Sequence, residues 1–320
     1  MKSRALFVDD EPLVLSGLRR MLRSLRHDWD MSFANSGREA LELLDGGDFA
    51  VVVSDMRMPE MDGATLLNEI AARHPATARL VLSGHAELEA ILRAVRPAHQ
   101  FLAKPCDPKL LEGALQRIRM TGFDPKTDAL CTKLGTHRRL PSPTAMIDAL
   151  RAALLETPAD LEKFSAIVSG DIAMSIQLLR LVNCAFFGPP TRTFDPRKAV
   201  SILGADILMR LLDDVELFRP IDQAARHEED AVIALNDRVQ EHISSCRSHG
   251  VASSVEIAPE ISAMLSLAGP LAALETPEPL DREGEQALGR LLLAYWGLDA
   301  EGISAEKTAD RPRQPELERA

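Results

Sequence analysis

Short apolar runs alternate with segments of helical apolar spacing along the first hundred residues of the chain. The strand-like runs cover residues 5–8, 49–53, 79–82 and 100–103. Such alternation is typical of a parallel sheet, because each parallel connection needs a crossover segment that is usually a helix. The pattern therefore predicts an α/β domain over residues 1–120.

Polar side chains follow each of the four runs. Asp9 and Asp10 follow the first run, Asp55 the second, Ser83 the third and Lys104 the fourth. Ligands of open parallel sheets bind at the carboxyl ends of the strands, so we expect these side chains to converge on one site.

The chemistry of this set favours phosphoryl transfer to a carboxylate. Clustered aspartates repel one another unless a cation lies between them, and Mg²⁺ suits a site of few carboxylate oxygens. One aspartate can then form an aspartyl phosphate, with the Ser83 hydroxyl and the Lys104 ammonium as donors to the phosphoryl oxygens. Each residue alone has a simpler explanation as a helix cap or a solvated charge, so the prediction depends on their occurring together.

Four motifs around these residues resemble the receiver domain of two-component response regulators. They are LFVDDEP (residues 6–12), SDMRMPEMDG (54–63), LSGHA (82–86) and FLAKP (101–105). The resemblance covers residues 2–119 and implies a flavodoxin-like, doubly wound fold whose parallel sheet has the strand order 2-1-3-4-5.

The resemblance also implies a role for each matching residue. Asp55 is expected to be the phosphoacceptor, and Asp9 and Asp10 are expected to be the acidic pair that holds Mg²⁺. Asp55 itself and the backbone carbonyl of Arg57 would be further metal ligands. No other catalytic residue is predicted.

Three more residues receive roles from the same resemblance. Ser83 and Lys104 would bind the phosphoryl group, and Phe101 lies where receivers carry an aromatic switch residue. A cis peptide is implied between Lys104 and Pro105, since X-Pro bonds tolerate the cis form. Gly63 is expected to permit a positive φ before the following helix.

The second half of the chain has helical apolar spacing from residue 143 to about residue 220. Breaks fall at residues 157–158, 169–171, 188–190 and 195–196. No strand-like alternation intervenes, which predicts an all-α domain.

The motifs of this half resemble the HDOD domain, a helical signalling module related to HD-type phosphohydrolases and generally regarded as lacking their metal site. They are LPS (140–142), IVSGDIA (167–173), LLRLVNCAFFG (178–188) and AVSILG (199–204), and residues 287–298 resemble the closing helix of the module. We predict a receiver at 1–120, a linker at 121–139, an HDOD-like output domain at 140–299 and a disordered tail at 300–320.

Metal-dependent hydrolysis by the second half is disfavoured. The only His-Asp dipeptide, His27-Asp28, lies in the first domain, and residues 263–270 contain neither histidine nor carboxylate. An HD phosphohydrolase needs such ligands to hold its metal ions. A phosphohydrolase gated by the receiver stays open as an alternative that bound metal would support.

Charge and apolar patterning argue against several other classes of protein. The formal net charge is −11 without a dense Lys/Arg block, which makes nucleic-acid binding unlikely and leaves a DNA-binding transcriptional regulator as a second alternative. The four cysteines are isolated and are expected to be reduced thiols. Neither a signal peptide nor a membrane span is predicted, so we expect a cytoplasmic protein.

The combined prediction is a response regulator that is not an enzyme beyond the chemistry of its receiver. A histidine kinase or phosphotransfer protein would phosphorylate Asp55 with Mg²⁺. The new charge would switch the helical domain, which acts on an unidentified downstream protein; homodimerisation is compatible with this scheme.

Overall fold

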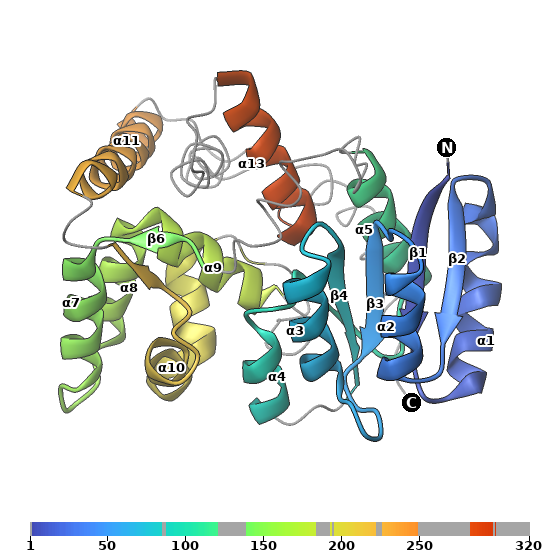
Figure 1. Cartoon of the computed structure of the whole chain (residues 1–320). Helices are drawn as coiled ribbons and strands as arrows, with labels where there is room; N and C mark the ends of the chain where they lie inside the picture. The colour runs from blue at the N-terminus through green and yellow to red at the C-terminus, as the bar shows by residue number, and fades with distance from the viewer. Residues whose placement is uncertain are drawn as a thin grey trace, which may run out of the picture.

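The computed structural model describes residues 2–84, 88–120, 139–183, 193, 195–221, 226–248, 282–296 and 298. Figure 1 shows an α/β half beside a helical half. Most of the predicted linker, the predicted break at 188–190 and the predicted tail at 300–320 lie outside the described residues. The predicted domain limits therefore stay predictions.

The α/β half contains a five-stranded parallel sheet with the order β2-β1-β3-β4-β5. The strands are β1 (Ser3–Val8), β2 (Trp29–Ala34), β3 (Val51–Asp55), β4 (Ala78–Ser83) and β5 (Gln100–Ala103). Every residue of β3 and β4 is buried, as expected of central strands with helices on both faces. The predicted flavodoxin-like order is confirmed.

β2 is the strand that no apolar run indicated. It lies at one edge of the sheet, and only its terminal residues Trp29 and Ala34 are buried, whereas Asp30 is exposed. An edge strand can carry polar residues that face water, so its hydrophobic signal is weak. Its position had to come from the family resemblance.

Short helices connect the strands, and a last helix follows β5. They are α1 (Pro12–Met21), the 3₁₀ helix η1 (Leu22–His27), α2 (Gly37–Asp45), α3 (Gly63–Arg73), α4 (Leu88–Ala94) and α5 (Pro108–Met120). Side-chain caps fix two of their starts: Ser36 accepts a hydrogen bond from the Glu39 amide, and Asp62 accepts one from the Thr65 amide. These caps set where the loops at the carboxyl ends of β2 and β3 stop.

The second half is helical, as predicted. Its elements are α7 (Thr144–Leu154), α8 (Leu161–Gly170), α9 (Ile172–Val182), α10 (Pro196–Asp213), α11 (Arg226–Ser248) and α13 (Arg282–Trp296). All residues of α9 are buried, so this helix forms the centre of the half. Gly204 interrupts α10 with a φ of 71°, a left-handed conformation that favours glycine.

A small sheet accompanies these helices and differs from the expectation of helices alone. β6 (Pro141–Ser142) pairs in parallel with β7 (Arg219–Pro220). Strands of two residues are too short to show alternation, so periodicity could not reveal them. Within the described part of the chain, no single helix is long and apolar enough to cross a membrane.

Asp171 organises the junction between β6, α9 and α11. Its Oδ1 accepts hydrogen bonds from the Met174 amide at 2.7 Å and from the Ser142 hydroxyl at 3.0 Å. The Asn236 Oδ1 accepts one from the Ile172 amide at 2.9 Å. Burial raises the pKa of Asp171 to about 6, against the hydrogen bonds that lower it.

Candidate functional site

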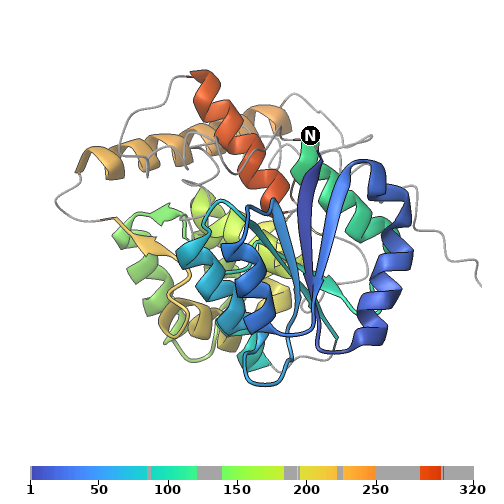
Figure 2. The same cartoon turned by 45° about the vertical axis from the view of Figure 1, so that its right-hand side comes forward.

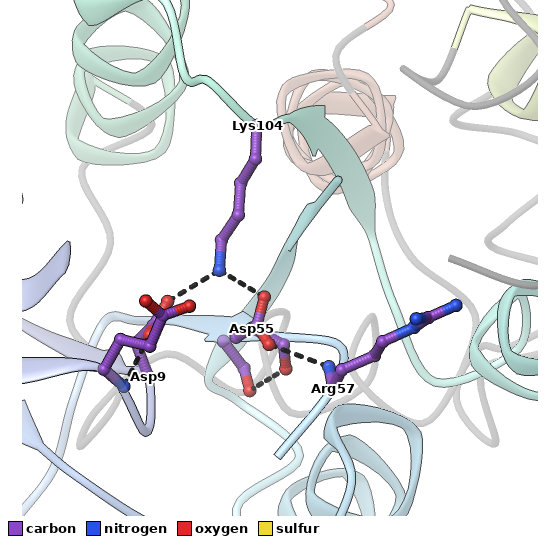
Figure 3. A network of polar contacts seen from close by, with 6 residues as sticks. Asp9, Asp55, Arg57 and Lys104 are labelled. Carbon is purple, nitrogen blue, oxygen red and sulfur yellow. Dashed lines mark hydrogen bonds and ion pairs between the residues drawn. The ribbon is translucent and has the colours of Figure 1, made fainter. Parts of the chain in front are cut away.

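Three of the predicted site residues meet at the carboxyl end of the sheet. Asp9 follows β1, Asp55 ends β3 and Lys104 follows β5 (Figure 3). The Lys104 Nζ lies 2.7 Å from Oδ2 of Asp9 and also contacts Oδ1 of Asp55. Asp9 and Asp55 are buried, so this ammonium is a counter-charge held between two carboxylates inside the protein.

The backbone orients both carboxylates toward the lysine. The Glu11 amide donates to Oδ1 of Asp9 at 3.0 Å, and the Arg57 amide donates to Oδ2 of Asp55 at 2.8 Å. Each carboxylate thus has one oxygen bonded within its own loop and the other oxygen directed at Lys104. Such fixed hydrogen bonds hold the two acids in place before any ligand arrives.

The two acids keep Lys104 protonated. Burial lowers the pKa of the Lys104 ammonium, but the hydrogen bonds and negative charges of Asp55 and Asp9 outweigh it and raise the pKa above its usual value. A permanent cation beside Asp55 suits the binding of an anionic group, because charge-assisted hydrogen bonds to phosphate oxygens are strong.

Ser83 and Phe101 lie on the neighbouring strands. Ser83 ends β4, and its carbonyl accepts a hydrogen bond from the Lys104 amide at 2.8 Å. The Ser83 Oγ is buried and makes no hydrogen bond with the described residues. A buried hydroxyl without a partner costs free energy, so an acceptor that reached it would be bound favourably. Phe101 is buried in β5.

The donor set fits Mg²⁺ in its chemistry. Asp9, the half-buried Asp10 and Asp55 offer the hard oxygen atoms that this ion prefers, and Mg²⁺ needs only one or two protein carboxylates. In the described part of the chain, no group of three or more histidine, cysteine or acidic side chains is close enough to hold a metal. The metal-ligand roles of these aspartates and of the Arg57 carbonyl stay predictions.

Two backbone predictions have different outcomes. The Lys104-Pro105 peptide is cis, as the resemblance implied. Gly63 does not have the positive φ that was expected of it; the left-handed residue of this loop is Glu60, with a φ of 62°. Glycine is needed at position 63 for another reason, since a Cβ there would lie 2.2 Å from the Asp55 carbonyl oxygen. The first residue of α3 therefore lies in close contact with the backbone of β3, the strand that ends with Asp55.

An ion pair beside the site was not predicted. Asp62, which caps α3, accepts a hydrogen bond from Arg93 of α4 at 2.8 Å. Burial raises the pKa of Asp62, but the Thr65 hydrogen bonds and the Arg93 charge outweigh this and lower it. The Asp-x-x-Thr spacing could have indicated the cap, whereas no sequence signal pairs Asp62 with Arg93.

Two remaining candidates do not join the site. His27 ends η1, and its neighbour Asp28 forms an ion pair with Arg119 of α5 at 3.2 Å. Cys106 is a free thiol whose pKa burial and the nearby Asp107 raise to about 11. The thiols of Cys131, Cys184 and Cys246 lie outside the described residues and side chains.

Comparisons with known proteins agree with this arrangement. The response regulator receiver domain model matches residues 5–116, and the HDOD domain model matches residues 140–240. The chain is 29% identical over 193 residues to the transcriptional regulatory protein ZraR of Escherichia coli (strain K12), an alignment that covers 56% of this chain and 43% of that protein. It is 43% identical over 118 residues to the sensor kinase CckA of Brucella abortus (strain 2308), covering 35% of this chain and 12% of that kinase.

Among solved structures, the chain is similar to the signal receiver domain of an HD domain-containing protein from Pseudomonas fluorescens Pf-5. The identity is 31%, with 38% of this chain and 96% of that chain covered and a TM-score of 0.36. The chain spans less than half the length of the curated relatives named above. From the two matched families and the observed sheet order, the chain contains a response regulator receiver domain followed by an HDOD domain.

Proposed function

We propose that this protein is a phosphorylation-controlled switch of a two-component pathway. Asp55 accepts a phosphoryl group from a histidine kinase or a phosphotransfer protein, and the helical domain passes the signal on by binding another protein. The observation that carries the proposal is the Lys104 ammonium held between Asp9 and Asp55 at the carboxyl end of the sheet. The proposed domains are residues 1–120 and 140–299, with a linker between them.

The residues of the site have distinct tasks in the transfer. A carboxylate oxygen of Asp55 attacks the phosphorus of the partner's phosphohistidine; the new O–P bond forms as the N–P bond breaks, and the imidazole leaves with a proton from solvent. Lys104 supplies positive charge to the added phosphoryl oxygens, and the Ser83 hydroxyl gains the acceptor that it lacks among the described residues.

Mg²⁺ would be held by Asp9, Asp10, Asp55 and the Arg57 carbonyl. When bound, it would neutralise the charge of the phosphoryl oxygens. The same three aspartates without a cation would repel one another, which explains why a lysine ammonium lies between two of them here.

The helical domain is proposed to act by binding and not by hydrolysis. Support comes from the sequence, which lacks the set of histidine and aspartate ligands that an HD phosphohydrolase needs. The buried polar residue Asp171 is used in a cap and in a hydrogen bond to Ser142, which is a structural role. Incubation with Mn²⁺ or Zn²⁺ and metal analysis of the washed protein would test this, and a stoichiometric metal bound through residues 140–299 would contradict it.

The phosphoacceptor is tested by incubating the full chain with acetyl phosphate and Mg²⁺, followed by intact-mass analysis. We expect the wild type to gain one phosphoryl group and Asp55→Asn to gain none. Asp148→Asn, which removes an exposed carboxylate of the helical domain, is the matched control and should label like the wild type. Equal labelling of Asp55→Asn and the wild type would show that another residue is the acceptor.

Light scattering after size exclusion tests the output. The wild type and Asp55→Asn are compared with and without beryllofluoride, which mimics a phosphoryl group. A change of oligomeric state or shape that Asp55→Asn does not show would support a regulated interaction surface, and the search for a downstream protein should then use the activated form.

A further inference from the structure

Arg180 of α9 is a buried cation at the junction between the two halves. Its guanidinium donates to the carbonyl of Val95 at 2.8 Å and to that of Ala98 at 3.4 Å, just beyond the end of α4. Its Cζ also lies 4.7 Å from the centroid of the Trp296 ring. A cation at the carboxyl end of a helix is favourable, as is one over an indole face. Arg180 therefore joins α9, α4 and α13.

α13 makes a second set of contacts with the receiver. The Gln100 side chain donates to the Ala294 carbonyl at 2.9 Å, and the Tyr295 hydroxyl donates to the Ala76 carbonyl at 3.3 Å. The rings of His99 and Tyr295 lie 4.8 Å apart. Figure 2 shows α13 reaching down to the sheet from the helical half. Gln100, His99 and Tyr295 are buried, so this junction excludes water.

β5 and α4, the two receiver elements at this junction, also lie next to residues of the Asp55 site along the chain. β5 begins with Gln100 at the junction and is followed by Lys104 at the site, only four residues later. α4 begins five residues after Ser83 and ends directly before Val95. Its seven residues span about 10 Å as a rigid helix. A displacement of Lys104 toward a new phosphoryl group would therefore reach the junction through β5, and a displacement of α4 would reach it through Val95 and Ala98.

Burial of Arg180 makes a partly separated junction unfavourable. A buried guanidinium that loses its partners is an uncompensated charge away from water, which is very costly. When Val95 and Ala98 move with α4, Arg180 must either follow them or separate into solvent. The exposed pair between Arg210 and Glu89, at 2.7 Å, also crosses from α10 to α4 but can rearrange freely in water.

We propose that Arg180 and α13 form an interdomain lock that holds the receiver in its unphosphorylated conformation and releases it when Asp55 is phosphorylated. This inference rests on the proposed function and names the contact through which the signal leaves the receiver. Arg180 is a positioning residue for α4, not a residue of the acceptor site. By thermodynamic linkage, a lock that opens on phosphorylation also opposes phosphorylation.

Trp296 provides a reporter inside the lock. The chain has two tryptophans, Trp29 in β2 and Trp296 under Arg180, and both are buried. In a Trp29→Phe background, all tryptophan emission comes from Trp296. We expect Mg²⁺ and beryllofluoride to shift this emission to the red, because the Trp296 ring becomes exposed to water. The emission should stay unchanged when Asp55→Asn is also present. Small-angle scattering of the unsubstituted chain should show a larger radius of gyration under the same conditions.

Substitutions in the lock test the linkage. Arg180→Met keeps the length and the apolar contact with Trp296 but removes the charge, and Gln100→Leu weakens the same junction from the receiver side. Each should red-shift Trp296 without any ligand and tighten the apparent affinity for beryllofluoride about fivefold or more. Arg210→Ala is the control at the exposed pair and should do neither.

Labelling by acetyl phosphate separates the two proposals. Normal labelling of Asp55 with unchanged Trp296 emission and radius of gyration would overturn the lock and leave the proposed function intact. A weaker affinity for beryllofluoride in Arg180→Met would also overturn it, because the junction would then favour the phosphorylated state. Absence of labelling in a folded wild type would overturn both.

Discussion

Asp55 in the receiver and Asp171 in the helical domain are both buried carboxylates, yet their surroundings differ in charge. Asp55 contacts the ammonium of Lys104. The partners of Asp171 in the described part of the chain are neutral and include the Ser142 hydroxyl and the Met174 amide. Burial consequently raises the pKa of Asp171 to about 6. The difference teaches that a charged partner, and not burial alone, distinguishes a site prepared for an anion from a structural hydrogen-bond network.

Removal of the charged partner should have the largest effect. Lys104→Met leaves the buried Asp9 and Asp55 facing each other without a cation, so we expect the free energy of unfolding at pH 7 to fall by about 3 to 4 kcal/mol. Urea denaturation measures the loss, with Lys104→Arg as the control that keeps the charge. An equal loss in Lys104→Arg would show that packing, not charge, is what Lys104 supplies.

Asp171 should make the protein less stable as the pH rises. The folded state keeps this proton up to about pH 6, whereas the unfolded chain loses it near the ordinary pKa of an aspartate, 3.8. Between these values the folded state binds more protons, so the free energy of unfolding falls with rising pH, by about 3 kcal/mol in total. Asp171→Asn should remove this component from the denaturation curves between pH 4 and pH 7. An unchanged slope in Asp171→Asn would show that this carboxyl is not the source of the pH dependence.

Substitution of Gly63, which lies against the backbone of Asp55, should have a smaller effect on stability. A Cβ at position 63 meets the Asp55 carbonyl oxygen, a backbone atom that cannot turn aside, so Gly63→Ala should cost about 2 kcal/mol of stability. The substitution should also slow labelling by acetyl phosphate, because the added methyl group displaces the end of β3 that carries Asp55. Gly17→Ala in α1 has open space around its Cβ and should stabilise the chain by about 0.5 to 1 kcal/mol. If both variants behaved alike, close approach would not explain Gly63.

The exposed ion pair between the halves should have the smallest effect. Arg210→Ala removes the contact with Glu89, and an exposed pair of this kind contributes little to stability. Even that difference should vanish when denaturation is repeated in 1 M salt. A larger, salt-resistant loss would place Arg210 with the half-buried Lys104 and the buried Arg180 rather than apart from them.

Residues at strand ends were predictable from the sequence, and contacts between distant elements were not. The apolar runs located β1, β3, β4 and β5, and hence the convergence of Asp9, Asp55 and Lys104. β2 gave no such signal because an edge strand faces water. The positive φ expected of Gly63 was wrong. A glycine in a motif does not reveal whether its φ angle or the closeness of its neighbours is what requires a glycine there.

Arg180 shows the same limit in the second half. It was visible only as one polar position in the apolar segment that became α9, and its partners Val95 and Trp296 lie 85 and 116 residues away. Periodicity reports which face of a helix is buried but not what covers it.

The complete burial of α9 limits where the helical domain can recognise another protein. Apart from residues such as Arg180 that an opened junction would uncover, the side chains of α9 cannot contribute to a surface, so specificity for a downstream protein has to be encoded by the surrounding helices, such as α7, α8, α10 and α11. Its amide protons should be among the slowest of the chain to exchange with deuterium, because exposing them requires the domain to unfold. Variation between related proteins with different partners should therefore concentrate around α9 and spare it.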